Sequence, residues 1–360
     1  MRHSILYSFL AAITLCFAAI HATADSLNLG ERIQPIPRSA VFQDEGHFTW
    51  GGSMIRGEDG RYYLCYSRWP YKHEMAGWIT HSEIALAVAD HPLGPYKHHS
   101  VLLQGRGEGF FDANMIHNPH VHKFDGKYYL YYVGSTTHEE RRETRMSQRV
   151  GVAMADCITG PWERLPEPLI DVTPNSFDGG FTTNPSVTKF GDQYIMIYKC
   201  LDDRTQIVFH GVAFSDSPTG PFKKHDEPIF TDDEHRFPAE DPFIFTYEGT
   251  LYAVLSDHAV FTDIHQALAM FTSPNGIDWE LAENYLVSTL EVTWEDGEKE
   301  ELADLERLQI YFDEDGEPAV MFCAATRGQR APGTTFNIHI PLKESLLSRS
   351  SDTPPCCETE

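Results

Sequence analysis

Hydrophobic and polar positions alternate along most of the chain, in short runs separated by turn residues. One run, DGRYYLCYS at 59–67, returns as DGKYYLYYV at 125–133, and three looser copies follow. Each copy joins a Gly-containing turn to an alternating aromatic run, which predicts a β-hairpin. The turn glycines of the five copies are Gly60, Gly126, Gly191, Gly249 and Gly316.

A second string follows the first four hairpins at a nearly constant offset. It reads ALAVADHPLGPYKHH from 85, GVAMADCITGPWERL from 151, GVAFSDSPTGPFKKH from 211 and ALAMFTSPNGIDWEL from 267. Each copy predicts a strand of small residues, a turn with Pro or Gly, and a short edge strand. Because a further apolar string precedes each hairpin, a unit contains four antiparallel strands. This repeat predicts an all-β fold, a five-bladed β-propeller with four-stranded blades.

The fifth unit is expected to close the ring. TFNIHIPL at 335–342 alternates as a strand, and IQPIPRSAVF near residue 33 is expected to add the strand that blade five lacks. A propeller joins its first and last blades in this way because open sheet edges invite aggregation. Helical periodicity is weak, and only HEERRETRMSQRV and EKEELADLERL could form a turn or two. We expect one closed domain over 27–345 and a disordered tail over 346–360.

The N-terminus predicts a secretory signal peptide over residues 1–24. An apolar stretch from Ile5 to Ile20 ends at Ala22-Thr23-Ala24, an A-x-A cleavage site. The alternative is a membrane anchor, but the stretch is short for a span of about 20 residues. We therefore expect a secreted or periplasmic protein with no membrane attachment after cleavage.

Charge and cysteine content narrow the choice of partner. The formal net charge of −25 argues against nucleic-acid and anionic-membrane partners, since both need basic surface. Cys65, Cys157, Cys200 and Cys323 lie far apart in apolar segments, so we expect buried free thiols. No zinc-type spacing occurs in the sequence.

The repeated strings carry a family likeness. NPHVHKFDGKYYLYYVGS followed by GVAMADCITGPW resembles the inverting glycoside hydrolases of family 43 and their five-bladed relatives in families 32, 68 and 117, some labelled sucrases. The likeness extends over all five blades and implies an active site at one end of the central funnel, where the innermost strands begin. Those strand starts read WGGS, HNPH, TNPS, AEDP and LERL, and their side chains are expected to share a pocket.

The resemblance assigns only one catalytic carboxylate directly. It implies an Asp base in blade one, a modulating Asp in blade two and a Glu acid in blade four. Glu240 matches the acid, and burial together with the Asp241 charge is expected to raise its pKa. Gly51 or Gly52 stands at the position of the base, and His120 stands at the blade-two position.

Three carboxylates are candidates for the missing base. They are Asp241, Asp112 in GFFDANMIHNP, and Glu306 in LERL. Each also has an ordinary structural explanation. Asp241 could cap a turn before a proline. Glu306 could form a buried ion pair with Arg307, and Asp112 could be a solvated loop residue.

The remaining candidates would bind a carbohydrate. Asn118 and Asn184 share an Asn-Pro position, and amides suit a hydroxyl-rich ligand, although they could simply begin strands. Trp69 and Trp78, in an aromatic-rich insertion at 67–83, could stack on a sugar ring or pack in the core. The Arg and Lys candidates could contact an anionic substituent, and the His candidates could donate hydrogen bonds or act as acids. The predicted substrate-binding set is Arg56, Arg68, Trp69, His117, Asn118, His120, Asn184, Lys199 and Arg307.

These features together predict an exported glycoside hydrolase, exo-acting on terminal sugars of oligosaccharides or polysaccharides. The missing blade-one carboxylate leaves an alternative, a carbohydrate-binding propeller that does not hydrolyse its ligand. A protein-interaction propeller is a third class, which the clustered carboxylates disfavour. No cofactor is expected to be required. A three-His metal site is disfavoured because alternation sets His117 apart from His120 and His122, while the resemblance allows a structural calcium.

Overall fold

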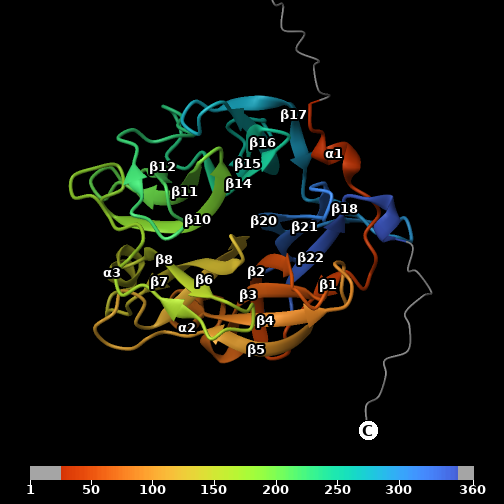
Figure 1. The fold of residues 1–360 in the computed structure, drawn as a ribbon, viewed down its shortest axis with the longest axis horizontal. Helices are drawn as coiled ribbons and strands as arrows, with labels where there is room; N and C mark the ends of the chain where they lie inside the picture. The colour runs from red at the N-terminus through yellow and green to blue at the C-terminus, as the bar shows by residue number, and fades with distance from the viewer. Residues whose placement is uncertain (1–25, 348–360) are drawn as a thin grey trace, which may run out of the picture.

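The computed structural model describes residues 26–347, so the predicted signal peptide and most of the predicted tail lie outside the described residues. Five four-stranded antiparallel sheets form a ring around a central axis (Figure 1), which confirms the predicted five-bladed propeller. No helix within 26–347 is both long and apolar enough to span a membrane.

Each blade places its first strand in sequence next to the axis. Blade one contains β2 (His47–Arg56), β3 (Tyr62–Pro70), β4 (Glu83–Ala89) and β5 (Lys97–Leu103). Blade two contains β6 (Met115–Phe124), β7 (Lys127–Ser135), β8 (Arg149–Ala155) and β9 (Glu163–Arg164). Blade three contains β10 (Phe181–Phe190), β11 (Gln193–Leu201), β12 (Val208–Ser215) and β13 (Lys223–Lys224). Blade four contains β14 (Ala239–Tyr247), β15 (Thr250–His258), β16 (His265–Ser273) and β17 (Glu280–Ser288).

Blade five closes the ring as predicted. It contains β20 (Asp304–Phe312), β21 (Pro318–Thr326), β22 (Thr335–Pro341) and the N-terminal β1 (Val41–Phe42). The antiparallel register of β1 and β22 pairs Val41 with Ile338. A small hairpin of β18 (Glu291–Thr293) and β19 (Lys299–Glu301) precedes blade five.

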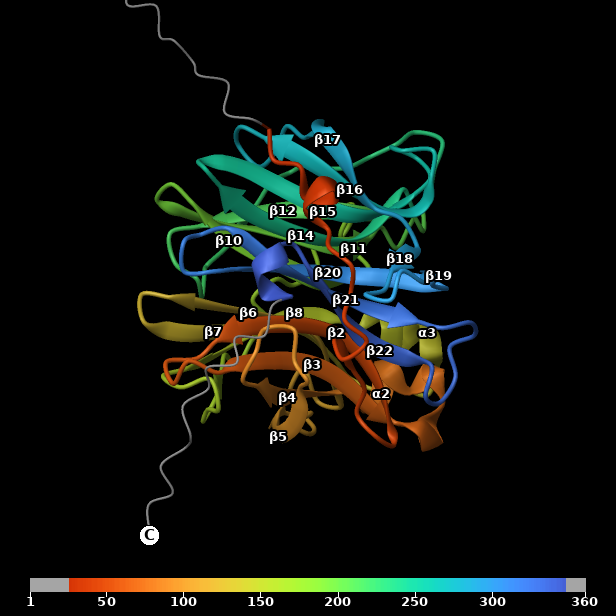
Figure 2. The ribbon, with the colours of Figure 1, turned by 90° about the vertical axis from the view of Figure 1, so that its right-hand side faces the viewer.

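The short helices are α1 (Leu29–Arg32), α2 (Trp78–His81) and α3 (Arg141–Met146), with 3₁₀ turns η1 (Tyr71–His73), η2 (Met75–Gly77) and η3 (Glu344–Leu346). The prediction of helix in HEERRETRMSQRV is confirmed by α3. The same prediction for EKEELADLERL is wrong, because β19 and β20 occupy that segment. Seen from the side, α2 and α3 lie at the same end of the ring (Figure 2).

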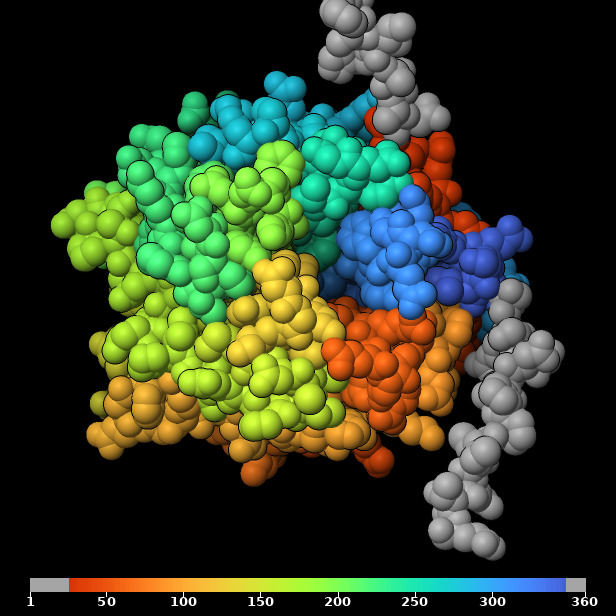
Figure 3. All heavy atoms as spheres, in the orientation of Figure 1, coloured from red at the N-terminus to blue at the C-terminus, as the bar shows by residue number. Residues whose placement is uncertain are grey.

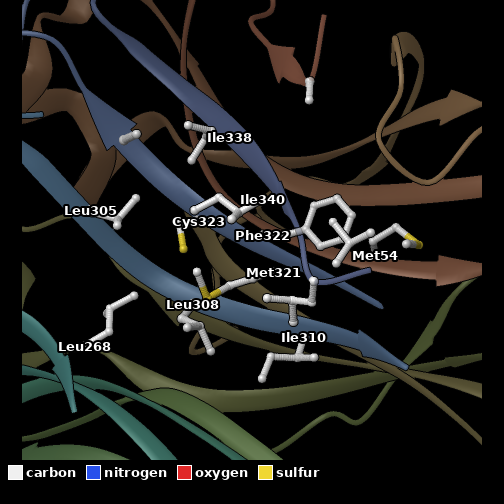
Figure 4. Close-up of a cluster of buried hydrophobic side chains, with 14 of the residues drawn as sticks. Met54, Leu268, Leu305, Leu308, Ile310, Met321, Phe322, Cys323, Ile338 and Ile340 are labelled. Carbon is white, nitrogen blue, oxygen red and sulfur yellow. The ribbon is translucent and has the colours of Figure 1, made fainter. Parts of the chain in front are cut away.

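Apolar side chains between the sheets hold the blades together. Leu268 of blade four, Leu305 and Phe322 of blade five, and Met54 of blade one belong to one buried cluster (Figure 4). Fully burying a side chain of this size contributes about 1.5–3 kcal/mol. Packing across blade boundaries therefore makes the ring a cooperative unit.

The face opposite α2 and α3, which carries the turn between β6 and β7, is shown in Figure 3.

The cysteine prediction holds for three of four residues. Cys65, Cys200 and Cys323 are buried free thiols. The prediction is wrong for Cys157, which is exposed, because β8 ends at Ala155 and the residue lies in the following turn.

A bulge interrupts each of the five innermost strands near its beginning. The antiparallel register shifts at this point in β2, β6, β10, β14 and β20. One residue of each bulge has a left-handed backbone, with φ between 44° and 56°. These residues, here called the axial ring, are Gly51, Asn118, Asn184, Asp241 and Arg307. Gly, Asn and Asp tolerate this conformation well, which explains four of the five positions.

Candidate active site

A cavity of about 170 Å³ lies where the innermost strands begin. Blade-one residues of η2 and α2, together with the loop that contains α3, contribute to its wall. Its lining residues are Trp50, Trp69, Met75, Trp78, His117, Asn118, Arg145, Gln148, Phe181, Thr183, Asn184, Lys199, Glu240, Asp241, Glu306 and Arg330. The expectation that the strand starts share a pocket is therefore met by the arrangement of all five blades.

The axial ring forms a hydrogen-bonded floor. The Asn118 amide donates to Asn184 Oδ1 over 2.8 Å, and the Asn184 amide donates to Asp241 Oδ1. Arg307 Nη1 lies 3.4 Å from the same Asp241 oxygen. A bulge re-aims side chains, so residues from distant parts of the chain meet at the axis. Blade one contributes only Gly51, which brings no carboxylate to the floor.

Glu240 lies on β14, and its carboxylate accepts a hydrogen bond from Lys199 of the neighbouring blade. Burial by itself would raise the pKa of Glu240, but the Lys199 charge and hydrogen bond outweigh it and hold the pKa below the ordinary value. The expectation of a raised pKa is wrong, because it overlooked the cation that β11 places beside this carboxylate. Glu240 is ionised at neutral pH.

Glu306 has the opposite electrostatic environment. Burial, together with the charges of Glu240, Asp241 and Asp304, raises the pKa of Glu306 to about 8, although Arg330 opposes the shift. Arg330 donates to Glu306 Oε1 over 2.8 Å but makes two hydrogen bonds to Asp304, of 2.8 and 2.9 Å. The effect of burial outweighs that of Arg330, so Glu306 is mostly protonated at neutral pH. The suggested buried ion pair between Glu306 and Arg307 does not form, since Arg307 pairs with Asp241.

Asp241 is buried, and burial raises its pKa against the opposing charge of Arg307. The third base candidate, Asp112, lies outside the cavity. Its side chain is fully buried and paired with Arg106 at 2.5 Å and Arg164 at 3.2 Å. Both explanations offered for Asp112 are therefore corrected: it is neither an overhanging base nor a solvated loop residue, but the centre of a buried ion-pair network.

The two histidine candidates occupy different depths. His117 lines the cavity, where Ser82 Oγ lies 2.8 Å from its Nδ1. Burial and the charges of Arg307 and Lys199 lower the pKa of His117 to about 3, so it is neutral and cannot serve as an acid at neutral pH. His120 does not line the cavity and lies 2.5 Å from His122, ring nitrogen to ring nitrogen. The bulge between His117 and His120 causes this separation.

Two of the arginines predicted to bind substrate, Arg56 and Arg68, do not line the cavity. Arg56 lies at the far end of β2 and pairs with Glu314. Arg68 pairs with Asp44 at 2.7 Å and Glu83 at 2.8 Å, outside the cavity. Proximity to an inner strand in the sequence does not determine the end of the strand or the face on which a side chain lies. Arg307 lies under the cavity as part of the floor.

Several lining residues were missed. Trp50 and Thr183 immediately precede the axial ring, as His117, Glu240 and Glu306 do, so aligning the strand starts could have found them. Met75, Arg145, Gln148, Phe181 and Arg330 come from loops, from the 67–83 insertion or from the first position of a strand, where the repeats carry no signal. Trp69 and Trp78 of the insertion do line the cavity.

The described chain shows no group of three or more His, Cys, Asp or Glu side chains arranged to hold a metal ion. The structural calcium allowed by the resemblance is not tested by this finding and stays a prediction.

The ring of five blades and the family match define the class of protein, a five-bladed propeller glycoside hydrolase. Residues 112–330 match the sequence profile of the glycosyl hydrolases family 32 N-terminal domain, and the chain belongs to this family. The matched segment covers blades two to four and the two inner strands of blade five, β20 and β21, and leaves blade one out.

Solved structures of glycoside hydrolases share the fold. Zg3597, a family 117 enzyme of Zobellia galactanivorans, is 18% identical with a TM-score of 0.61, over 88% of this chain and 91% of its own. An α-L-arabinofuranosidase from Lactobacillus brevis is 15% identical with a TM-score of 0.59, over 85% and 92%. Fructan 1-exohydrolase IIa from Cichorium intybus is 16% identical with a TM-score of 0.60, over 84% and 57%. No curated protein matches the sequence significantly.

Proposed function

We propose that this glycoside hydrolase is exo-acting and removes terminal sugars by the combined action of Glu306 and Glu240. The observation that carries the proposal is the opposite displacement of two pKa values in one cavity. The pKa of Glu306 is raised to about 8, whereas Lys199 holds that of Glu240 below its ordinary value despite burial. Glycoside hydrolysis needs one protonated and one ionised carboxyl group beside the scissile bond.

In this proposal Glu306 is the general acid. Its proton passes to the glycosidic oxygen as the bond to the anomeric carbon breaks, so the sugar or chain that leaves is neutral. The carboxylate of Glu240 either accepts a proton from the water that attacks the anomeric carbon, or attacks that carbon itself to form an ester that water then hydrolyses. In both cases a water oxygen ends on the released sugar. This assignment reverses the role that the family 43 resemblance implies for Glu240, and the reason is the environment of the two groups in this chain.

The shape of the cavity supports exo action. Its volume of about 170 Å³ is smaller than the roughly 300–1,000 Å³ of sites for drug-sized ligands, so it suits one sugar ring. Arg141 of α3 donates to the Ala76 carbonyl over 3.0 Å and ties the blade-one insertion to the blade-two loop. Trp78, which is half-buried, could stack on the apolar side of a sugar, whereas Trp69 is fully buried and stacks on Phe48 behind the cavity wall. The predicted signal peptide would place this activity outside the cytoplasm.

The test compares Glu306→Gln and Glu240→Gln on aryl glycosides with good and poor leaving groups. Loss of a general acid should slow poor leaving groups by about 10²–10⁴-fold and affect dinitrophenyl glycosides far less, because these need little protonation. Glu240→Gln should slow both kinds. Glu314→Gln, the same change at an exposed carboxylate, is the control. If only Glu240→Gln shows dependence on the leaving group, Glu240 is the acid and the proposal is wrong.

A second candidate function is carbohydrate binding without hydrolysis. It is favoured by Gly51, which stands where the resemblance implies a catalytic base. Calorimetry that detects a bound oligosaccharide, combined with unchanged oligosaccharide after prolonged incubation, would establish this alternative instead of the enzyme.

A further inference from the structure

Three of the four cationic side chains around the cavity form ion pairs with carboxylates, and the fourth, Arg145, does not form one within the described residues. Lys199 pairs with Glu240, Arg307 with Asp241, and Arg330 with Asp304. Glu306 is protonated at neutral pH and adds no charge. Arg145 also lines the cavity, yet within residues 26–347 no carboxylate forms an ion pair with it.

Arg145 lines the cavity from a helix that is anchored near both of its ends. Its guanidinium carbon lies 5.7 Å from the centre of the Phe181 ring, which also lines the cavity. The helix that carries it, α3, is fixed by Arg141 to Ala76 and by the Ser147 hydroxyl to the Thr136 carbonyl at 2.8 Å. The Arg145 side chain itself is exposed, and its guanidinium offers a planar set of N–H donors to the cavity.

Gln148 lies three residues further along and is only 2% exposed. It lines the same cavity, and its side-chain amide makes no hydrogen bond to any group in the described part of the chain. The amide is not among the fully buried polar groups that lack a partner, so it is accessible from the cavity, where water or a ligand can satisfy it. The Gln148 amide and the Arg145 guanidinium thus both offer N–H donors to the same cavity.

We propose that the sugar bound in this cavity carries an anionic substituent, a carboxylate or a sulfate ester, which Arg145 and Gln148 receive. The inference rests on the proposed function, because it names the substrate class of the same cavity. A site with an excess positive charge stands out in a chain whose formal net charge is −25. Guanidinium groups recognise carboxylate and sulfate oxygens through paired, charge-assisted hydrogen bonds.

Calorimetry with monosaccharides tests the inference without requiring turnover. Glucuronic and galacturonic acid, and the 6-sulfates of glucose and galactose, are compared with glucose and galactose. An anionic sugar is expected to bind about 10- to 100-fold more tightly than its neutral counterpart, as one or two charge-assisted hydrogen bonds provide. Preference for the uronic acids or for the sulfated sugars identifies the substituent.

Arg145→Met should abolish this preference, and Arg142→Met on the same helix should keep it, since Arg142 is exposed and lies outside the cavity. A panel in which no anionic sugar binds more tightly than its neutral counterpart overturns the inference. So does a preference that Arg145→Met leaves intact. Hydrolysis is measured separately, so an enzyme that prefers neutral sugars and a binder that prefers anionic ones give different results.

Discussion

Replacing Glu306 by glutamine should make the stability of the protein less sensitive to alkaline pH. The folded-state pKa of about 8 lies above the ordinary value of 4.5. A group with a raised folded-state pKa contributes stability that is fully present below its unfolded pKa and is lost as pH rises through the folded value. The free energy of unfolding of the wild-type protein therefore falls as Glu306 ionises in its buried site, whereas the glutamine variant has no such loss.

The magnitude follows from the same two values. At about 1.4 kcal/mol for each pH unit between them, the full effect is on the order of 5 kcal/mol, of which about 4 kcal/mol falls between pH 5 and pH 9. The Glu306 side chain is only 13% exposed, so solvent screens this effect little. A loss of this size is a large part of the roughly 5–15 kcal/mol by which domains are stable.

Urea unfolding at pH 5, 7, 8 and 9 measures the effect on wild type, Glu306→Gln and the control Glu314→Gln. The free energy of unfolding of wild type and control should fall by about 4 kcal/mol more than that of Glu306→Gln across this range. Other titrating groups are common to the three proteins and cancel in the comparison. Parallel curves for wild type and Glu306→Gln would refute the assignment of a protonated Glu306.

Three further changes test separate parts of the structure. Lys199→Met should raise the pKa of Glu240 and move the acid limb of the activity profile to higher pH, because the main charge that opposes the effect of burial is then removed; an unmoved limb would contradict this. Arg141→Ala should weaken substrate affinity about fivefold, which would be seen as a higher KM with kcat little changed. The reason is that the hydrogen bond from Arg141 to the Ala76 carbonyl, worth about 1 kcal/mol, holds the blade-one insertion against the loop that contains α3. Phe322→Ala should lower the free energy of unfolding by about 3–5 kcal/mol, measured by urea titration, because the ring is fully buried between blades.

The propeller could be predicted from the sequence because each blade repeats the same pattern of turn residues and alternating strands. Gly60 and Gly126 lie in the hairpin turns with left-handed backbone, and β3 and β7 follow them. Closure by β1 followed from the need to cover the edge of blade five. The wrong helix at EKEELADLERL shows the limit, because leucines at helical spacing there serve a strand that is buried on both faces.

The site was only partly readable for a different reason. Glu240 and Glu306 were found because the repeats align their strand starts. Their pKa values were not predictable, since these depend on Lys199 and Arg330, which reach the carboxylates from other strands and loops. Asp112 failed as a base because its partners come from elsewhere in the fold. Local sequence indicates which residues begin a strand, whereas the charge of each group is set by neighbours distant along the chain.

The pH dependence of kcat/KM on the best aryl glycoside tests the central claim most directly. Activity should require ionised Glu240 and protonated Glu306. It should therefore fall only at a pH below the ordinary carboxyl range on the acid side, and above about pH 8 on the alkaline side. With a dinitrophenyl glycoside, the residual activity of Glu306→Gln should lack the alkaline limb. Wild-type activity that stays constant from pH 7 to pH 10, or an alkaline limb that persists unchanged in Glu306→Gln, would contradict the account.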